Sequence, residues 1–191
     1  TPLNMYKHFC HEGGIASPLL MSWPVQLKNS GAWVRDSAHL MDIVPTVLEA
    51  TGVSYPGVYK GQKITPVAGT SLLSPARGTA LPERALAFEH QKARGLRLSQ
   101  WKITWGKRQP TDPAWALYDM QADRSEQHNL ASDRPELLQG LVTEWESWAK
   151  RVGVDGFARG AIPGSASNPS DTSPLVVNQP LKIVADVQSS E

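Results

Sequence analysis

A stripe of apolar residues between positions 135 and 152 constrains the fold of this chain more than any other feature. Asp133 can cap a helix there, Pro135 suits its first turn and Gly153 can end it. Its apolar side chains recur at the i, i+3 and i+4 spacing of one helix face: Leu137, Leu138, Leu141, Val142, Trp145, Trp148, Ala149 and Val152. Because such a helix gains most of its stability from packing, we expect a sheet to cover this face.

Short segments upstream of the helix alternate apolar and polar residues, as half-buried antiparallel strands do. The segments span residues 86–88, 96–98, 101–105 and 115–118. We predict a four-stranded antiparallel sheet with one face covered by the helix, which is a small α+β layer structure. The five tryptophans from Trp101 to Trp148 then lie in the core rather than on a sugar-stacking platform.

The part of the chain before this sheet is less periodic. Residues 15–23 are mostly apolar and lie between a Gly-Gly pair and a proline, which favours a buried strand. Asp42 and Gly52 predict a short helix over residues 43–50, with Asp42 as its N-cap. Its apolar face would carry Val44, Val47 and Leu48. Residues 54–84 are rich in Pro, Gly and Thr, and we expect them to form a surface loop.

Composition and charge exclude several classes of protein. A formal net charge of +1 does not give the field of a non-specific nucleic-acid binder. No apolar run approaches the ~20 residues that span a bilayer. The first residues show neither the basic nor the apolar region of a signal peptide. A single cysteine cannot form an internal disulfide, so this is not a disulfide scaffold.

Residues 6–15, Tyr-Lys-His-Phe-Cys-His-Glu-Gly-Gly-Ile, hold the densest group of reactive side chains. Their spacing matches no common zinc pattern and lacks Cys-x-x-Cys, so we predict no metal ligand in this chain. Cys10 could be a nucleophile, although a partly buried small apolar side chain is the simpler interpretation. Gly13 and Gly14 could bring the backbone close to an anion or simply form a turn.

Several segments, taken in order, resemble the sulfatases of the alkaline-phosphatase superfamily, and the arylsulfatase branch fits best. The first is Lys7 followed by Glu12-Gly13-Gly14-Ile15, Pro18 and Trp23-Pro24. The others are His39 to Leu48, then Glu89-His90 with Arg97 and Trp101-Lys102, then Leu117-Tyr118-Asp119 leading to Asp123, Ser125-Glu126 and Asn129-Leu130-Ala131. The matches follow the order of the family over residues 4 to 152.

The resemblance implies a partial α/β fold: the end of the large sulfatase domain, followed by a small α+β subdomain with a four-stranded antiparallel sheet packed on a C-terminal helix. Residues 1–83 would belong to the large catalytic domain and residues 84–154 to the subdomain. Residues 155–180, rich in Pro, Ser and Gly, would form a linker. Residues 181–191 would be either a docked terminal strand or the start of a truncated further domain.

As to function, the resemblance implies a sulfuric-ester hydrolase. In that family a formylglycine, made from Cys or Ser in a Cys/Ser-x-Pro-x-Arg motif, attacks sulfur, and Ca²⁺ held by Asp and Asn oxygens binds the sulfate. The motif does not occur here, since Cys10 is followed by His11-Glu12-Gly13. The metal ligands of the family also precede the matched region. We therefore expect formylglycine and Ca²⁺ upstream of this chain, and no activity from the chain alone.

Lys7 matches the lysine that contacts a sulfate oxygen in sulfatases, so it is the candidate catalytic and substrate-binding residue. A compact ammonium group supplies charge and donors to a dianionic transition state; the alternative is a solvated surface lysine. His8, His11 and His90 are further candidates for substrate binding, with structural roles left open for each. Glu12 is expected to hydrogen-bond the following loop.

The expected partner is a sulfated small molecule or sulfated carbohydrate, and a periplasmic or secreted location is implied by the resemblance only. Two other interpretations remain open from the sequence. One is a phosphatase or phosphodiesterase of the same superfamily, which would use a Thr or Ser nucleophile and two zinc ions. The other is a non-catalytic carbohydrate-interaction module, whose aromatic side chains would face solvent.

Overall fold

The computed structural model of the chain describes residues 2–28, 31–106 and 114–154. Its elements, in order, are α1 (Glu12–Ile15), a 3₁₀ turn η1 (Leu40–Asp42), α2 (Ile43–Thr51), β1 (Val58–Tyr59), β2 (Gln62–Lys63), α3 (Leu73–Ala76), β3 (Leu86–His90), β4 (Ala93–Leu98), β5 (Trp101–Trp105), β6 (Trp115–Asp119) and α4 (Pro135–Val152). The predicted linker and the predicted terminal strand, residues 155–180 and 181–191, lie outside the described residues.

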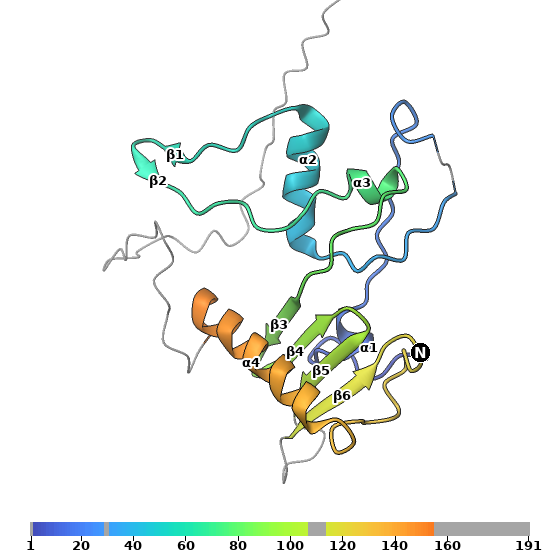
Figure 1. Ribbon diagram of the computed structural model, residues 1–191. Coiled ribbons are helices and arrows are strands. Elements are labelled where there is room, and N and C mark those ends of the chain that lie inside the picture. The colour runs from blue at the N-terminus through green and yellow to red at the C-terminus, as the bar shows by residue number, and fades with distance from the viewer. Residues whose placement is uncertain (1, 29–30, 107–113, 155–191) are drawn as a thin grey trace, which may run out of the picture.

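The predicted sheet is confirmed. Strands β3, β4, β5 and β6 lie side by side in chain order, and each pair is antiparallel (Figure 1). The register places Leu96 opposite Ile103 and Ile103 opposite Leu117. These three side chains are buried on the face that α4 covers, together with Leu141 and Trp145 of the helix. Alternation along the strands therefore produces the core that the sequence predicts.

Helix α4 forms as expected, but its first residue is capped differently. Arg134, not Asp133, occupies the N-cap position, and no side chain bonds the first turn, while Pro135 begins the helix. Gly153 ends it in the left-handed conformation, with φ of 76°, as the glycine predicts. Trp145 is 0% exposed, and its indole N–H donates to the Phe88 carbonyl oxygen at 3.0 Å.

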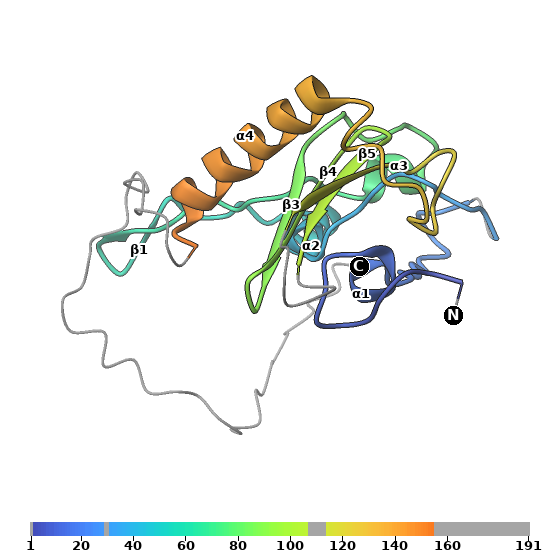
Figure 2. The ribbon, with the colours of Figure 1, turned by 90° about the horizontal axis from the view of Figure 1, so that it is seen from below.

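The opposite face of the sheet is also covered, which the sequence analysis did not predict. Figure 2 shows α4 on one side of the strands and α1, with the N-terminal segment, on the other. Lys102 and Thr104, the polar positions of β5, point to this second face and are buried. Polar residues at alternate positions are typical of a solvated face, but here a charged network and hydrogen bonds satisfy them.

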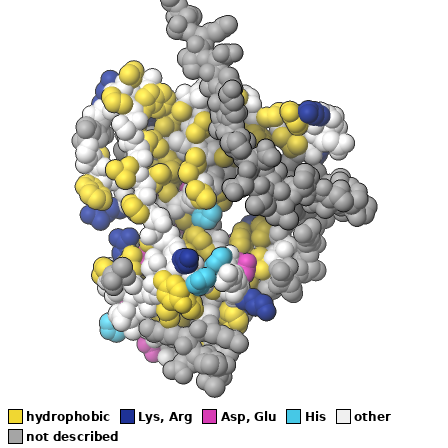
Figure 3. All heavy atoms as spheres, turned by 180° about the vertical axis from the view of Figure 1, so that it is seen from behind, with side chains coloured by type: hydrophobic (Ala, Val, Ile, Leu, Met, Phe, Trp, Pro, Cys, Tyr) yellow, Lys and Arg dark blue, Asp and Glu magenta, His cyan; other side chains and the backbone are white. Residues whose placement is uncertain are grey.

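The segment between α1 and the sheet departs most from expectation. Residues 16–23 form no strand within the described part of the chain, and Leu20 is 89% exposed. In α2 the expected apolar residues Val44 and Val47 are exposed, and Thr46 is the buried one. Residues 54–84 are not all loop, because they contain the short β1–β2 pair and α3. On the face shown in Figure 3, hydrophobic side chains gather over the half of the molecule that contains α2.

Asp42 anchors this region to the sheet. Its carboxylate accepts hydrogen bonds from the backbone N–H of His39 (2.7 Å) and of Thr70 (2.9 Å) and forms a two-bond ion pair with Arg84, just before β3. Asp42 occupies the N-cap position of α2, as predicted, but its side chain makes no cap bond to that helix. Its carboxylate instead completes the capping box of η1, whose N-cap is His39. Burial favours the neutral acid, but the Arg84 guanidinium and the two N–H groups outweigh it and lower the pKa of Asp42.

Within the described residues, no helical segment combines the length and the hydropathy of a membrane span.

Trp145→Ala should destabilise the chain by roughly 3–5 kcal/mol, because it empties the centre of the layer between α4 and the sheet. Chemical denaturation followed by circular dichroism would measure the loss. Trp33→Ala is the matched control, since Trp33 is 88% exposed and its removal should change little. Equal stability of the Trp145 variant and the wild type would show that α4 does not cover the sheet.

Stability should also depend on the ionisation of Asp42. A lowered folded pKa contributes stability above the unfolded value, near pH 4, and that contribution is lost as pH falls through the lower folded pKa. The wild type should therefore have a higher free energy of unfolding than Asp42→Asn above about pH 5. This difference should become smaller below pH 4. Urea unfolding at pH 7 and pH 3 measures it, with the surface variant Asp133→Asn as control. A gap that widens at pH 3 would contradict this assignment.

Candidate functional site

The residues around Lys7 form a tight loop that two glycines make possible. A Cβ atom on Gly13 would lie 2.2 Å from the Met5 carbonyl oxygen, and one on Gly14 would lie 1.9 Å from that of Phe9. The Gly13 N–H donates to the Asn4 carbonyl oxygen at 2.8 Å and so closes the loop. Side chains at either glycine would push this loop apart, so the pair is needed for its close backbone packing.

Lys7 lies on the outer turn of this loop. The turn is closed by a hydrogen bond of 2.9 Å from the Phe9 N–H to the Tyr6 carbonyl oxygen. The Tyr6 ring packs edge-on against the rings of both His8 and Phe9. Lys7 is exposed, so its ammonium group is free to meet a ligand or another part of a larger protein.

Under the loop, Lys102 of β5 joins two carboxylates in the protein interior. Its Nζ lies 2.8 Å from Glu12 Oε1 and 2.8 Å from Glu126 Oε1. The Glu12 backbone N–H also donates to Glu126 Oε2 at 2.9 Å. We call Lys102, Glu12 and Glu126 the buried triad. The sequence analysis expected Glu12 to hydrogen-bond the following loop. Its side chain and N–H instead contact the sheet and the turn after β6.

The two carboxyl groups of the buried triad respond differently to burial. Desolvation raises the pKa of both, but for Glu12 the Lys102 ammonium group, helped by Arg97 and Arg124, outweighs it and holds the pKa below its ordinary value. For Glu126 desolvation prevails, and its pKa is raised. The triad thus keeps Glu12 ionised against Lys102, and this is the ion pair that fixes α1 to the sheet.

A shallow cavity of about 370 Å³ opens beside Lys7. The residues that line it come from the loop, from the end of β3, from the residue before η1 and from α4: Lys7, Phe9, Cys10, Gly14, Ile15, His39, Ala87, Phe88, Glu89, His90 and Trp148. Figure 3 shows histidine side chains next to a basic side chain near the middle of one face. The cavity therefore combines an exposed cation with imidazole groups.

The structure brings three of the predicted site residues together. His8 Nδ1 lies 2.9 Å from Gln91 Oε1, and the His8 ring stacks on His90 with centroids 6.0 Å apart. Lys7 and His90 line the same cavity. Gln91 and Lys92 form the two-residue β3–β4 turn and both take left-handed conformations, with φ of 50° and 72°. The contact between His8 and Gln91 joins the tip of this hairpin to the Lys7 loop.

His11 lies apart from Lys7, His8 and His90. It is 7% exposed, its Nε2 lies 3.1 Å from Thr104 Oγ1, and its ring packs against Tyr118 on the sheet. The substrate-binding role predicted for His11 finds no support in this position, because the side chain points into the protein. The structural role, the alternative from the sequence, fits the contacts.

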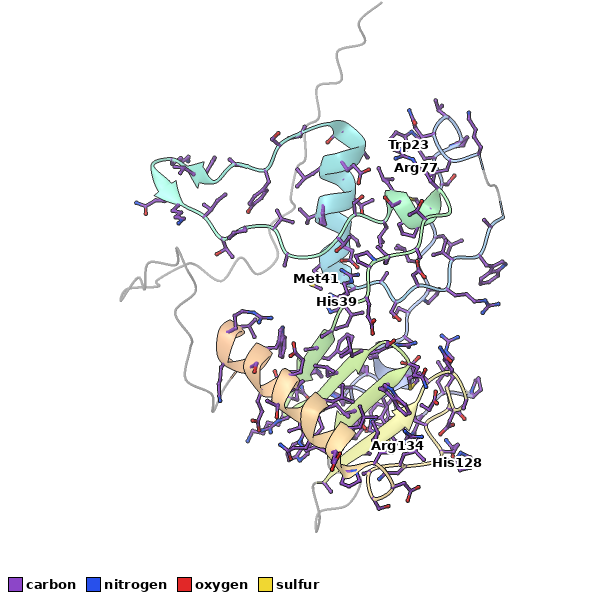
Figure 4. All side chains as sticks on the ribbon, in the orientation of Figure 1. Trp23, His39, Met41, Arg77, His128 and Arg134 are labelled. Carbon is purple, nitrogen blue, oxygen red and sulfur yellow. The ribbon has the colours of Figure 1, made fainter. Side chains whose placement is uncertain are left out.

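His39 lines the cavity although the sequence analysis did not select it as a site residue. Figure 4 shows His39 and Met41 at the end of α2 that faces the sheet. The Met41 N–H donates to His39 Nδ1 at 3.2 Å, and the ring lies 5.3 Å from that of Phe88. Burial lowers the pKa of His39, so its imidazole is neutral near pH 7. Its position at the start of the stretch from His39 to Leu48 was the signal that could have identified it.

Cys10 is buried and lies against the backbone of the sheet. A Cβ atom on Gly95 would come within 2.7 Å of Cys10 Cβ, so β4 and the loop pack closely at this point. Burial raises the pKa of the Cys10 thiol to about 12. A thiol in this state is a poor nucleophile, which favours the packing role over the catalytic one. In the described residues, no group of three or more His, Cys, Asp or Glu side chains is arranged to hold a metal ion.

Comparison with known proteins gives consistent matches. The family described as "N-sulphoglucosamine sulphohydrolase, C-terminal" matches residues 4–146. Arylsulfatase K of Danio rerio is 31% identical over 161 residues, which cover 77% of this chain and 29% of that protein. An uncharacterized sulfatase of Schizosaccharomyces pombe is 27% identical over 159 residues, covering 81% of this chain and 28% of that protein.

Solved structures share the fold. The crystal structure of Ps i-CgsB matches with a TM-score of 0.64 and 21% identity, covering 85% of this chain and 35% of that one. A glycosaminoglycan-metabolism sulfatase of Bacteroides thetaiotaomicron matches with a TM-score of 0.61 and 20% identity, covering 78% of this chain and 32% of that one. The chain spans about a third or less of the curated relatives' length.

Cys10 should resist thiol reagents in the folded chain, because a buried thiol with a pKa of about 12 is neither accessible nor ionised near pH 8. It is the single cysteine, so labelling by a disulfide reagent reports on it alone. We expect slow labelling of the native chain and rapid, complete labelling in guanidinium chloride. Rapid labelling under native conditions would show that the thiol is open to solvent.

Proposed function

Since the chain belongs to the sulfatase family and matches the C-terminal region of its members, we propose that it forms the C-terminal part of an arylsulfatase-like sulfuric-ester hydrolase. The family match favours sulfate-ester cleavage over the phosphatase or phosphodiesterase alternative. A non-catalytic carbohydrate module would expose the tryptophans of the sheet and of α4, whereas Trp145 is buried and Trp101, Trp115 and Trp148 pack against the core. These observations favour sulfatase function over both alternatives.

The observation that carries the proposal is the position of Lys7. It is an exposed cation at the edge of a cavity, on a loop whose base is fixed by the buried triad. In the proposed reaction the Lys7 ammonium group binds a sulfate oxygen and offsets the negative charge that builds up as the ester bond breaks. Because the loop that carries Lys7 is fixed before the substrate arrives, less reorganisation is needed to bring this charge to the transition state.

The histidines beside Lys7 suit the part of the substrate around the sulfate. His8 and His90 stack on each other, and Gln91 holds His8 through Nδ1. We propose that His8 and His90 contact the leaving-group side of a sulfated small molecule or sulfated carbohydrate. The description of the matching family, which names N-sulphoglucosamine, supports a sulfated sugar as one substrate class.

The remaining chemistry is proposed to lie outside this chain. The sequence contains no Cys/Ser-x-Pro-x-Arg motif for a formylglycine, and buried Cys10 does not replace it. A bound Ca²⁺ would supply positive charge to the sulfate oxygens. We propose that both groups belong to the upstream part of the enzyme, that the chain alone is inactive, and that the enzyme acts in the periplasm or outside the cell.

In the full-length enzyme, Lys7→Ala should lower kcat for 4-nitrophenyl sulfate by roughly 10²–10³-fold, because one charged donor to the transition state is lost. Steady-state kinetics measure the effect. Lys63→Ala, a change of the same kind at an exposed position on β2, is the control and should leave kcat unchanged. A Lys7 variant with wild-type kinetics would remove Lys7 from the site.

A further inference from the structure

We propose that Lys102 is a positioning residue for Lys7: through Glu12 and Glu126 it fixes both ends of the loop that presents the Lys7 ammonium group. The inference rests on the function proposed above, because it assumes that Lys7 acts on the substrate. Lys102 itself is sealed from the cavity and from solvent, with 0% of its side chain exposed, so it can act only through the loop.

A fully buried ammonium group at the centre of a strand needs a reason. Desolvation makes such a charge costly unless good partners surround it. Lys102 has two partners, Glu12 Oε1 and Glu126 Oε1, each 2.8 Å from its Nζ. An apolar side chain at this position could pack between sheet and loop just as well, but without a preferred direction. The hydrogen bond to Glu12 and the ion pair with Glu126 join two separate segments to Lys102 and define one placement of the loop on the sheet.

These bonds reach both ends of the Lys7 loop. At its C-terminal end, Glu12 is bound through its carboxylate to Lys102 and through its N–H to Glu126 Oε2. At its N-terminal end, the Asn4 side-chain amide donates to the Glu126 carbonyl oxygen at 3.2 Å. The Gly13 N–H joins the two ends through the Asn4 carbonyl oxygen. Lys7 therefore lies on a turn whose two ends converge on the buried triad.

The conformation of Glu126 agrees with this role. Its φ of 57° places a residue other than glycine in the left-handed region, which is unfavourable for a side chain with a Cβ. A buried residue keeps such a conformation when its surroundings require it. In Glu126 it lets the backbone carbonyl meet Asn4 while the carboxylate meets Lys102 and the Glu12 N–H.

A double-mutant cycle in the full-length enzyme tests the inference, with Lys7→Ala, Lys102→Met and their combination assayed on 4-nitrophenyl sulfate. With Lys7 present, Lys102→Met should lower kcat roughly 10- to 100-fold and change KM much less, because misplacing a catalytic group by about 1 Å has effects of this size. In the Lys7→Ala background the same change should lower kcat less than about threefold, because the ammonium group that Lys102 positions is then absent.

The control and the second variant keep the result interpretable. Ile103→Ala, at the next residue of β5, removes a buried side chain on the α4 face. It should lower the melting temperature, yet its effect on kcat should be equal in both backgrounds. Should Lys102→Met not fold, as judged by circular dichroism, Glu126→Gln replaces it in the cycle, since its amide oxygen can still accept the Glu12 N–H.

Each outcome has one meaning. A large effect of Lys102→Met or Glu126→Gln that depends on Lys7 supports the positioning role. Equal fold losses with and without Lys7 overturn that role while leaving the proposed function intact. An unchanged kcat in Lys7→Ala alone overturns the proposed function, and the positioning role with it.

Discussion

The ion pairing of one buried lysine with two carboxylates is the interaction on which the arrangement of this chain depends. Lys102 projects from the sheet on the side away from α4, where an unpaired ammonium group would oppose folding. Glu12 and Glu126 are 114 residues apart in the sequence and meet at this charge. They convert a sheet face that could be solvated into the support for the Lys7 loop. The apolar layer under α4 stabilises the sheet, and the buried triad determines what lies on its other side.

Much of the fold could be predicted because it follows from local patterns. Alternation in β3 to β6 and the stripe in α4 identify these elements without knowledge of their partners. The second covered face could not be predicted in this way, because Lys102 occupies a position in the alternation that is typical of solvent exposure. The buried strand predicted for the apolar run does not form at residues 16–23. An apolar run predicts burial, but it does not show whether a neighbouring strand is present to pair with it. Capping by Arg134 instead of Asp133 lies within the usual uncertainty of helix ends.

The residues of the candidate site were also predicted only in part. Lys7 and His90 were identified by their place in an ordered series of motifs, and the structure puts both at one cavity. The sequence could not separate His8 from His11, although His8 lies beside His90 and His11 packs under the loop. His39 was missed as a site residue because its contacts depend on how α2 sits against β3, which no local pattern encodes. Lys7 is therefore identified by the sequence, and its neighbours at the cavity by the structure.

Amide hydrogen exchange at Glu12 tests whether the Lys7 loop is fixed to the sheet, since this N–H donates to the Glu126 carboxylate. We expect the Glu12 and Gly13 amides to exchange as slowly as those in the centre of β5. In Lys102→Met these two amides should lose their protection, while the amides of β5 that face β4 keep theirs. If the Glu12 amide of the native protein exchanged as fast as those of the exposed residues Ser54, Tyr55 and Gly57, the Lys7 loop would not be fixed to the sheet by the buried triad.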